Sequence, residues 1–297
     1  MAATGIAAAS IDTPPARGLP GQAPTRAEVM PQATQENFTV ASLLLPRRER
    51  RALLGIYGFA RVVDDAGDEV RGDRTALLDW LEADVARMFS GVPIHPLLRR
   101  LARSVHEFDL PRKPFLRLIS ANRLDQERAR YETYDELAAY CDLSANPVGE
   151  LVLHVFRTAT PDRVRLSDDV CTALQLAEHL QDVGEDFARG RIYLPSEDFR
   201  RFGVEEGDLR VEEPSDPLRS LLAFEVERAR ALLAAGVPLV ASLRGRAKLA
   251  VAGYVGGGRA ALDAIERSGF DVLRRAPKAT TTARLAATVE VLRKSAR

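Results

Sequence analysis

Apolar residues recur at helical spacing from Glu36 to about Ala276, in long segments rich in Leu, Ala, Arg and Glu. Pro and Gly interrupt these segments, and runs of β-branched residues that would indicate strands are few. The strongest segment follows Pro46 and predicts a helix from Arg47 to roughly Glu69. Further helices are predicted at 74–90, 95–107, 112–129, 134–144, 147–158, 168–187, 216–235, 239–267 and 279–294. We therefore expect an all-α protein.

The first part of the chain has a different composition. Residues 1 to about 33 are rich in Ala, Pro, Thr and Gly and show little apolar periodicity, so we expect a disordered leader over 1–33. The breaks between the predicted helices are short, and no repeat period is evident. This pattern favours one helical domain over residues 34–297 rather than two smaller domains.

Composition excludes several classes of protein. Lys and Arg number 42, as do Asp and Glu, so the formal net charge is zero and no basic field for nucleic acid is present. No run approaches the roughly eighteen apolar residues of a membrane span, and no basic start followed by an apolar block indicates a secretory signal. Cys141 and Cys171 are too few for a disulfide framework and fit a reducing cytosol, so we expect a cytoplasmic protein.

The first of two acidic clusters lies at the end of the first predicted helix and contains Asp64, Asp65 and Asp68. Asp64 and Asp68 share one helical face, although like charges at that spacing repel. The helix dipole also disfavours acidic residues at the carboxyl end of a helix. An apolar stretch that includes Val62 and Val63 precedes the cluster. These features favour a functional site, while a solvated helix end is the alternative interpretation.

The second cluster is a ladder of one sign, formed by Glu178, Asp182 and Asp186 at intervals of four residues. A solvated helical face more often alternates the sign of its charges. His179 lies off the ladder, and we interpret it as a packing or capping histidine rather than a metal ligand.

Hard oxygen ligands suit Mg²⁺, and Mg²⁺ held by a few carboxylates usually completes its coordination with phosphate oxygens. The two clusters therefore predict a pair of acidic helices that bind a diphosphate through magnesium. Arg189 and Arg191 follow the second cluster and could donate hydrogen bonds to that diphosphate, although a surface role explains either one equally well. The predicted metal ligands are Asp64, Asp65, Asp68, Glu178, Asp182 and Asp186.

Three motifs in this order resemble the squalene/phytoene synthase family of isoprenoid synthases. They run from Glu36 to Pro46, from Ile56 to Asp65 and from Asp182 to Pro195. The resemblance covers roughly residues 36–275 and implies the isoprenoid synthase fold, a single helical domain around a central cavity. It also implies that the two acidic helices face each other across Mg²⁺ and the substrate diphosphate.

The resemblance assigns roles by position. Asp64 and Asp68 resemble the family's first metal-binding pair and Asp182 and Asp186 its second, and these four with Arg61 are the expected catalytic residues. Residues at positions that line the diphosphate end and the cavity are Phe38, Tyr57, Arg61, Tyr140 and Gln175. The expected substrate-binding set also includes Asn146, Gln181 and Arg191.

Some positions depart from the family pattern. Where the family has Asn and Arg four residues and one residue before the second pair, this chain has Glu178 and Gln181. Glu178 can still bind metal, whereas Gln181 removes a cation that would hold phosphate. Three glycines at 256–258 each cost a helix about 1 kcal/mol relative to Ala, which indicates close packing or space for a ligand. A nucleotide-binding loop does not fit them, because no strand precedes and the glycine spacing differs.

These departures, together with the run from Asn146 to Gly149, resemble the hydroxysqualene synthase branch of hopanoid biosynthesis. That branch implies ionisation of presqualene diphosphate with Mg²⁺, rearrangement in a dry cavity, and capture of the cation by water to give hydroxysqualene. Asn146 is the candidate for orienting the water. Aromatic candidates for contact with the cation are Phe38, Tyr57, Phe59 and Tyr140, with core packing preferred for Phe59. We find no sequence signature for NADPH, which a squalene synthase would need.

Two alternatives stay open. The nearest is a prenyltransferase that joins two farnesyl or geranylgeranyl diphosphates head to head into presqualene diphosphate or phytoene. The other, from a different class, is a non-catalytic helical binding subunit that retains the fold. The Arg-rich stretch 279–297 could lie on lipid as a peripheral contact with the inner membrane face or dock on the body of the fold. The oligomeric state also stays open.

Overall fold

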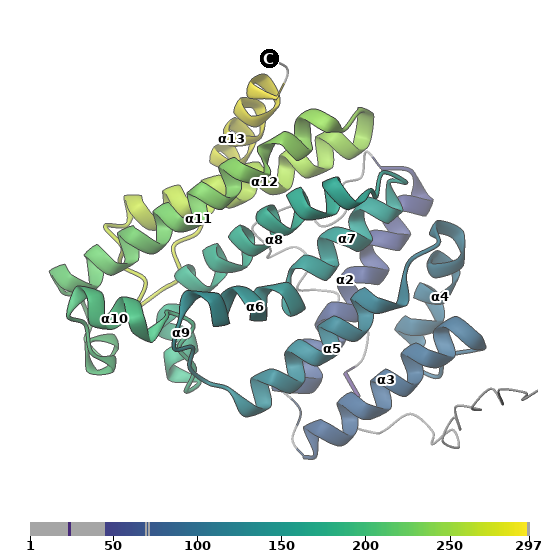
Figure 1. The fold of residues 1–297 in the computed structure, drawn as a ribbon, viewed down its shortest axis with the longest axis horizontal. Helices are drawn as coiled ribbons and strands as arrows, with labels where there is room; N and C mark the ends of the chain where they lie inside the picture. The colour runs from purple at the N-terminus through teal and green to yellow at the C-terminus, as the bar shows by residue number, and fades with distance from the viewer. Residues whose placement is uncertain (1–22, 25–44, 69, 71, 296–297) are drawn as a thin grey trace, which may run out of the picture.

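The computed structural model describes residues 23–24, 45–68, 70 and 72–295, and α-helices account for most of them (Figure 1). The described residues contain no β-strand, only one isolated parallel bridge between Arg130 and Ile192. The all-α prediction is therefore confirmed. Phe38 and the predicted leader, apart from Ala23 and Pro24, lie outside the described residues.

The helices form two groups with a pair between them (Figure 1). One group holds α2 (Arg47–Asp68), α3 (Arg74–Ser90), α4 (Pro96–Phe108) and α5 (Arg112–Glu127). The middle pair is α6 (Tyr134–Ser144) and α7 (Asn146–Val155). The other group holds α8 (Pro161–Gln181), α9 (Val183–Ala188), α10 (Ser196–Phe202), the 3₁₀ helix η2 (Glu206–Leu209), α11 (Asp216–Ser242), α12 (Gly245–Arg267) and α13 (Thr281–Lys294).

Helix α2 carries the first acidic cluster and is anchored by its apolar stripe. Ala52, Ile56, Phe59 and Val63 are buried at spacings of four, three and four residues, which is the pattern of one helical face. Phe59 packs edge to face on Phe115, with ring centroids 5.1 Å apart. The preference for core packing at Phe59 is confirmed. This stripe fixes the direction in which the following carboxylates project.

The helix predicted at 168–187 has different ends in the structure. It begins at Pro161, because Thr160 caps it by accepting a hydrogen bond from the amide of Arg163 and because proline suits the first helical position. It ends at Gln181, and the short helix α9 follows after Asp182. The predicted boundaries are therefore wrong at both ends. The break at Asp182 divides the second acidic cluster between two helices.

The predicted break between 235 and 239 is also wrong, since α11 continues to Ser242 through Pro238. Proline removes one helical hydrogen bond, but Leu239 and Val240 on the following turn are buried and hold the chain helical. The break comes instead at Leu243 and Arg244, before Gly245. The pattern analysis did not predict α10 or η2.

The glycines at 256–258 allow close helix packing. A Cβ atom on Gly256 would lie 2.6 Å from the backbone nitrogen of Thr288, so α12 and α13 are in backbone contact there. A Cβ on Gly258 would lie 2.6 Å from a methyl group of Leu174 on α8. The close-packing interpretation is confirmed. Helix α13 thus docks on α12, although it still exposes Leu285 and Val289, and membrane contact stays a prediction.

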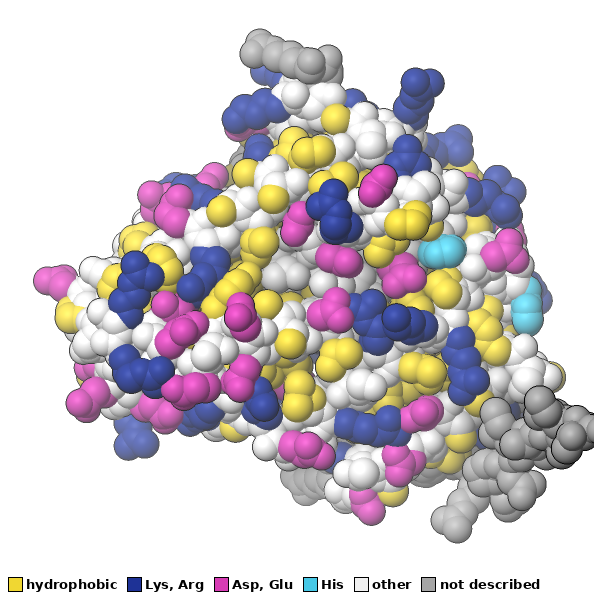
Figure 2. All heavy atoms as spheres, viewed as in Figure 1, with side chains coloured by type: hydrophobic (Ala, Val, Ile, Leu, Met, Phe, Trp, Pro, Cys, Tyr) yellow, Lys and Arg dark blue, Asp and Glu magenta, His cyan; other side chains and the backbone are white. Residues whose placement is uncertain are grey.

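Buried side chains gather in two clusters. One is built mainly from α2 to α5 with α7, and the other from α6, α8, α11 and α12. None of the helices within the described residues is long and apolar enough to span a membrane. On the face shown in Figure 2, acidic and basic side chains are intermixed over most helices, as the zero net charge suggests. The space between these two hydrophobic core clusters holds the candidate site.

Candidate functional site

A cavity of about 220 Å³ lies between the two core clusters. Its walls come from α2, from the α6–α7 junction, and from α8, α11 and α12. Apolar residues make up most of the lining, among them Leu53, Ile56, Val148, Val152, Leu153, Val170, Leu174, Leu239 and Val251. The cavity is therefore a place where an apolar group can be held away from water.

The charged lining residues lie toward the carboxyl ends of α2 and α8. Helix α2 contributes Tyr57, Arg61 and Asp64, and α8 contributes Gln175 and Glu178. The two helices that carry the acidic clusters therefore meet at one end of the same cavity. Five of the residues selected from the sequence share this wall.

Asp64 is held in place by the neighbouring helix α5. It accepts a hydrogen bond of 3.0 Å from the side-chain amide of Asn122, and a guanidinium nitrogen of Arg61 lies 4.0 Å from it. The side chain is 44% exposed in the cavity wall. Desolvation by the surrounding protein nevertheless raises the pKa of Asp64 to about 6, and Arg61 and Asn122 only partly oppose that effect.

The other two acids of the first cluster each pair with an arginine. Asp65 is buried and pairs with Arg61 at 3.1 Å, and it is not part of the cavity lining. Asp68 pairs with Arg191 at 2.7 Å. Asp65 therefore holds the guanidinium of Arg61, and its metal-binding role stays a prediction, while Asp64 and Asp68 lie at the site end of α2.

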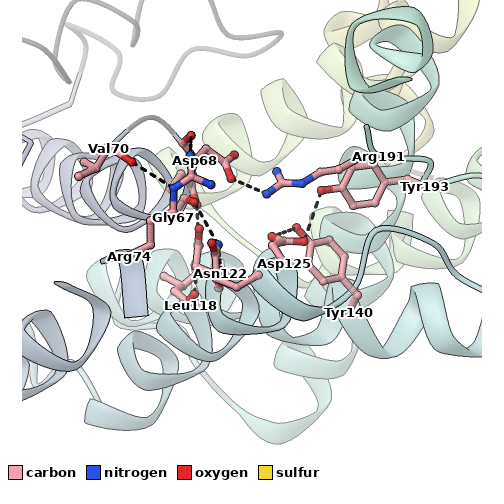
Figure 3. A network of polar contacts seen from close by, with 12 residues as sticks. Gly67, Asp68, Val70, Arg74, Leu118, Asn122, Asp125, Tyr140, Arg191 and Tyr193 are labelled. Carbon is pink, nitrogen blue, oxygen red and sulfur yellow. Dashed lines mark hydrogen bonds and ion pairs between the residues drawn. The ribbon is translucent and has the colours of Figure 1, made fainter. Parts of the chain in front are cut away.

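Arg191 reaches Asp68 because two extended segments run side by side. The amide of Ile192 donates to the carbonyl of Ala129 at 3.0 Å, and the amide of Ser196 donates to the carbonyl of Tyr131 at 2.9 Å. Figure 3 shows the Arg191 side chain pointing toward Asp68 from this segment. The segment after the second acidic cluster is thus tied to the first.

Asp125 on α5 is a site residue that the sequence analysis missed. It accepts hydrogen bonds from the hydroxyls of Tyr140 at 2.9 Å and Tyr193 at 3.4 Å (Figure 3). Burial raises the pKa of Asp125 to about 6, against the opposing effects of Tyr140 and Arg191. The available signal was the polar face formed by Asn122, Asp125 and Gln126 on α5. It was weak, because polar residues are common all around that helix.

A stack of rings links the two acidic clusters. His179 lies flat on Tyr193 with ring centroids 3.7 Å apart, and Tyr193 lies 5.6 Å from Tyr140. In the His179 ring, Nε2 lies 3.1 Å from the side-chain amide nitrogen of Gln175, and Nδ1 lies 3.9 Å from a carboxylate oxygen of Asp186. His179 therefore has the packing role expected from the sequence, beside the carboxylate of Asp186.

The second cluster lies at the break between α8 and α9. The amide of Asp186 donates to the carbonyl of Asp182 at 2.7 Å, which keeps the two residues on consecutive turns. The pKa of Asp182 is raised to about 6 by burial and then by the charges of Asp186 and Glu185. His179 and Lys278 lower it by smaller amounts. Neighbouring acids therefore add to the effect of burial on Asp182.

Three residues assigned to substrate binding have other contacts. Tyr140 is buried and bonded to Asp125. Asn146 is buried, accepts from the hydroxyl of Thr172 at 3.1 Å and donates to Asp142 at 3.3 Å. Gln181 donates to the carbonyl of Pro277. None of the three is in the cavity lining, so their binding roles stay predictions.

The donor set fits a hard divalent cation. Within the described ranges, no three His, Cys, Asp or Glu side chains are already arranged to hold a metal ion. However, Asp64 and Glu178 line one end of the cavity, and Asp68, Asp182 and Asp186 follow them at the ends of α2 and α8 and in α9. All five side chains supply only oxygen donors. Burial is the largest cause of the raised pKa values of Asp64 and Asp182, so a bound cation would offset the cost of keeping both carboxylates ionised. This is the environment that Mg²⁺ neutralises, and Mg²⁺ remains an expectation.

Comparisons with known proteins agree with this arrangement. The family profile described as squalene/phytoene synthase matches residues 32–283. A hydroxysqualene synthase of Rhodopseudomonas palustris is 34% identical over 210 residues, which are 70% of this chain and 72% of that protein. A presqualene diphosphate synthase of the same organism is 37% identical over 207 residues, 68% of this chain and 74% of that protein.

A solved structure is similar over most of its length. The crystal structure of squalene synthase HpnC from Alicyclobacillus acidocaldarius has a TM-score of 0.75 and 44% sequence identity to this chain. The match covers 81% of this chain and 91% of that one. The relatives thus carry several activities within one group of enzymes.

Proposed function

Because the chain belongs to the squalene/phytoene synthase family and has its isoprenoid synthase fold, we propose that it is a hydroxysqualene synthase. The substrate is presqualene diphosphate. Its carbon–oxygen bond breaks with the electron pair leaving on the diphosphate, and the carbocation rearranges. Water then adds and loses a proton to give hydroxysqualene. No reductant is consumed.

The observation that carries this proposal is the shared cavity. Asp64 on α2 and Glu178 on α8 line one end of it, and most of the other lining residues are apolar. A diphosphate at the acidic end would leave its hydrocarbon part among Leu53, Val170 and Leu174. Exclusion of bulk water from this region keeps the cation from premature capture.

Individual residues can assist the departure of the diphosphate and stabilise the carbocation that remains. Bound Mg²⁺, held by Asp64, Asp68, Glu178, Asp182 and Asp186, would supply neutralisation of the charge that develops on the leaving diphosphate. The guanidinium of Arg61 lies in the wall beside Asp64 and can donate to phosphate oxygens. Tyr57 offers an aromatic face to the cavity, where a cation–π contact contributes about 1–2 kcal/mol.

Position 181 favours ionisation of one diphosphate over condensation of two. The side-chain amide of Gln181 is neutral and donates to Pro277 rather than facing the cavity. This cluster therefore has one fewer cation than the family pattern, and a second diphosphate would have less positive charge to hold it. The 44% identity to a squalene synthase supports a thirty-carbon substrate for this chain.

Product analysis tests the proposal. Purified protein is incubated with Mg²⁺ and either presqualene diphosphate or farnesyl diphosphate, each with and without NADPH. We expect hydroxysqualene from presqualene diphosphate, equally with or without NADPH, and no product from farnesyl diphosphate. A cyclopropyl product from farnesyl diphosphate would instead identify a head-to-head prenyltransferase.

A pair of matched variants distinguishes an enzyme from a non-catalytic protein that has the same fold. Asp64→Asn should lower kcat/KM by about 10²–10³-fold, the usual cost of one electrostatic stabiliser of a transition state. Asp263→Asn removes an equal charge from the exposed face of α12 and should leave kcat/KM unchanged. A protein that turns over neither substrate would favour the non-catalytic binding subunit.

A further inference from the structure

Gly258 on α12 lies directly behind the wall of the cavity. Whereas Gly256 packs on the backbone of α13, a Cβ atom on Gly258 would lie 2.6 Å from the Cδ2 methyl group of Leu174 on α8. Leu174 is one of the residues that line the cavity. The missing side chain at position 258 therefore leaves room for a side chain of the cavity wall.

Leu174 lies just inside the acidic end of the cavity. It precedes Glu178 by four residues on α8, and Ala60 precedes Asp64 by four residues on α2. Four helical residues rise about 6 Å, so Leu174 and Ala60 both lie roughly one turn inside the carboxylates. Leu174 is partly exposed, whereas Ala173 beside it is buried. The width of the cavity at this level therefore depends on the position of the Leu174 side chain.

An alanine at position 258 would push Leu174 into the cavity. The three atoms nearest to the added Cβ are methyl groups of Leu174 and Leu233, so the first atoms to yield are the ends of side chains. Leu233 is fully buried, and a close-packed interior leaves it little space to move into. Leu174 borders the empty volume of the cavity. Leu174 is therefore the side chain that gives way.

We propose that Gly258 is a specificity-determining residue, which lets Leu174 lie back against α12 and so gives the cavity the width that a branched hydrocarbon needs below its diphosphate. In presqualene diphosphate, the carbon that carries the diphosphate is attached to a cyclopropane ring, and both long chains begin at that ring. Farnesyl diphosphate has a single chain at the same level. The inference rests on the proposed function, because it takes presqualene diphosphate as the substrate.

A comparison of branched and single-chain ligands on the full-length enzyme tests the proposal. Hydroxysqualene formation gives the KM for presqualene diphosphate, and farnesyl diphosphate and inorganic pyrophosphate are added as competitive inhibitors. Gly258→Ala should raise the KM for presqualene diphosphate about tenfold, the usual size of an overpacking effect. The inhibition constant of farnesyl diphosphate should rise less than about threefold, because one chain leaves space beside it. That of pyrophosphate should not change.

A compensating variant shows whether the effect passes through Leu174. Gly258→Ala adds one methylene group and Leu174→Val removes one, so the double variant conserves volume. Its KM for presqualene diphosphate should return to within about threefold of the wild type, since the two positions are coupled. Gly253→Ala is the matched control on the same helix, because no atom of the described residues lies within 4 Å of a Cβ placed there. It should leave all three constants unchanged.

A second way of narrowing the cavity leaves α12 untouched. Leu174→Phe enlarges the lining side chain itself and should raise the KM for presqualene diphosphate at least about tenfold, again with a smaller effect on farnesyl diphosphate. This variant tests the same level of the cavity even if Gly258→Ala folds poorly.

Several results would overturn the proposal. Equal losses for presqualene diphosphate, farnesyl diphosphate and pyrophosphate in Gly258→Ala would show a general structural effect, and an unchanged KM would show no effect on specificity. Failure of Leu174→Val to restore the KM would place the effect elsewhere. If the wild type itself forms no hydroxysqualene, the proposed function fails and the role of Gly258 fails with it. The wild type alone therefore distinguishes the two kinds of failure.

Discussion

The two acidic clusters have the same residue spacing but different electrostatic surroundings. In the first, Asp68 pairs with Arg191, Asp65 pairs with Arg61, and Asp64 accepts a hydrogen bond from Asn122. In the second, Asp182 lies beside Asp186 and Glu185, which raise its pKa. Burial raises the pKa of Asp64 and of Asp182 to about 6, but Arg61 and Asn122 oppose the rise at Asp64, whereas the neighbouring acids Asp186 and Glu185 add to it at Asp182.

This difference indicates that the two sides of the site are ordered to different extents before a ligand binds. A balanced network across α2, α5 and the segment at Arg191 can hold its carboxylates in fixed positions before any ligand binds. The second cluster lies at a helix break and depends on a positive group from outside. We infer that metal and diphosphate binding orders the second side more than the first.

The largest expected effect comes from neutralising one acid on each side. Asp68→Asn and Asp182→Asn should each lower kcat/KM for presqualene diphosphate by about 10²–10³-fold, because each removes a stabiliser of the leaving group. The two substitutions should change the melting temperature of the metal-free protein in opposite directions. Asp68→Asn leaves Arg191 without its partner and should lower the melting temperature. Asp182→Asn relieves repulsion from Asp186 and should raise it.

Thermal denaturation in EDTA, followed by circular dichroism, measures this contrast. Addition of Mg²⁺ and pyrophosphate should raise the melting temperature of the wild type, since ligands that bind only the folded state stabilise it. The rise should be smaller for both variants. If both variants melt below the wild type in EDTA, the two clusters do not differ as inferred.

The sequence was sufficient for what depends on local pattern. The apolar stripe through Ile56 and Phe59 predicts α2, and the spacing of Asp64 and Asp68 predicts a shared face. The cavity wall contains Arg61, Tyr57, Gln175 and Glu178, all of which the sequence predicts as site residues.

What depends on contacts between distant segments could not be predicted. Asp125 acquires its environment only when Tyr140 and Tyr193 meet it, and those residues are far apart in the chain. Gln181 was read as a possible ligand because nothing local shows that Pro277 will receive its amide. The predicted helix ends were wrong at two prolines. The cap from Thr160 starts a helix at Pro161, whereas burial of Leu239 and Val240 continues one through Pro238.

A smaller effect is expected from pH. The pKa of Asp182 is about 6 in the folded protein against an ordinary value of 3.8, so the folded state binds more protons than the unfolded state between these values. In the absence of metal, this carboxyl therefore favours the folded state at low pH and loses that contribution as pH rises from about 4 to about 6. Asn at 182 mimics the neutral form. The wild type should lose stability relative to Asp182→Asn over this range.

Urea denaturation at pH 4.5 and pH 7 in EDTA measures the difference between these two proteins. The comparison removes the contributions of Asp64 and Asp125, whose raised pKa values are shared by both proteins. With Mg²⁺ present the trend should reverse, because the metal binds the deprotonated carboxylate and its affinity rises with pH through about 6. A stability difference independent of pH would contradict the raised pKa of Asp182.

The smallest expected effect tests the balanced side alone. Asn122→Ala removes the hydrogen bond to Asp64 and should lower the free energy of unfolding by about 1 kcal/mol. The same bond lowers the pKa of Asp64, so its loss should shift the acidic limb of the kcat/KM profile to higher pH.

Gln126→Ala is the matched control. It lies on the same face of α5 and removes a hydrogen bond to the backbone of Gly67 without touching Asp64. It should cost similar stability but leave the pH profile in place, because it changes no contact of the carboxylate. Equal shifts in both variants would mean that α5 only supports α2 mechanically, and that the first cluster is not electrostatically balanced by Asn122.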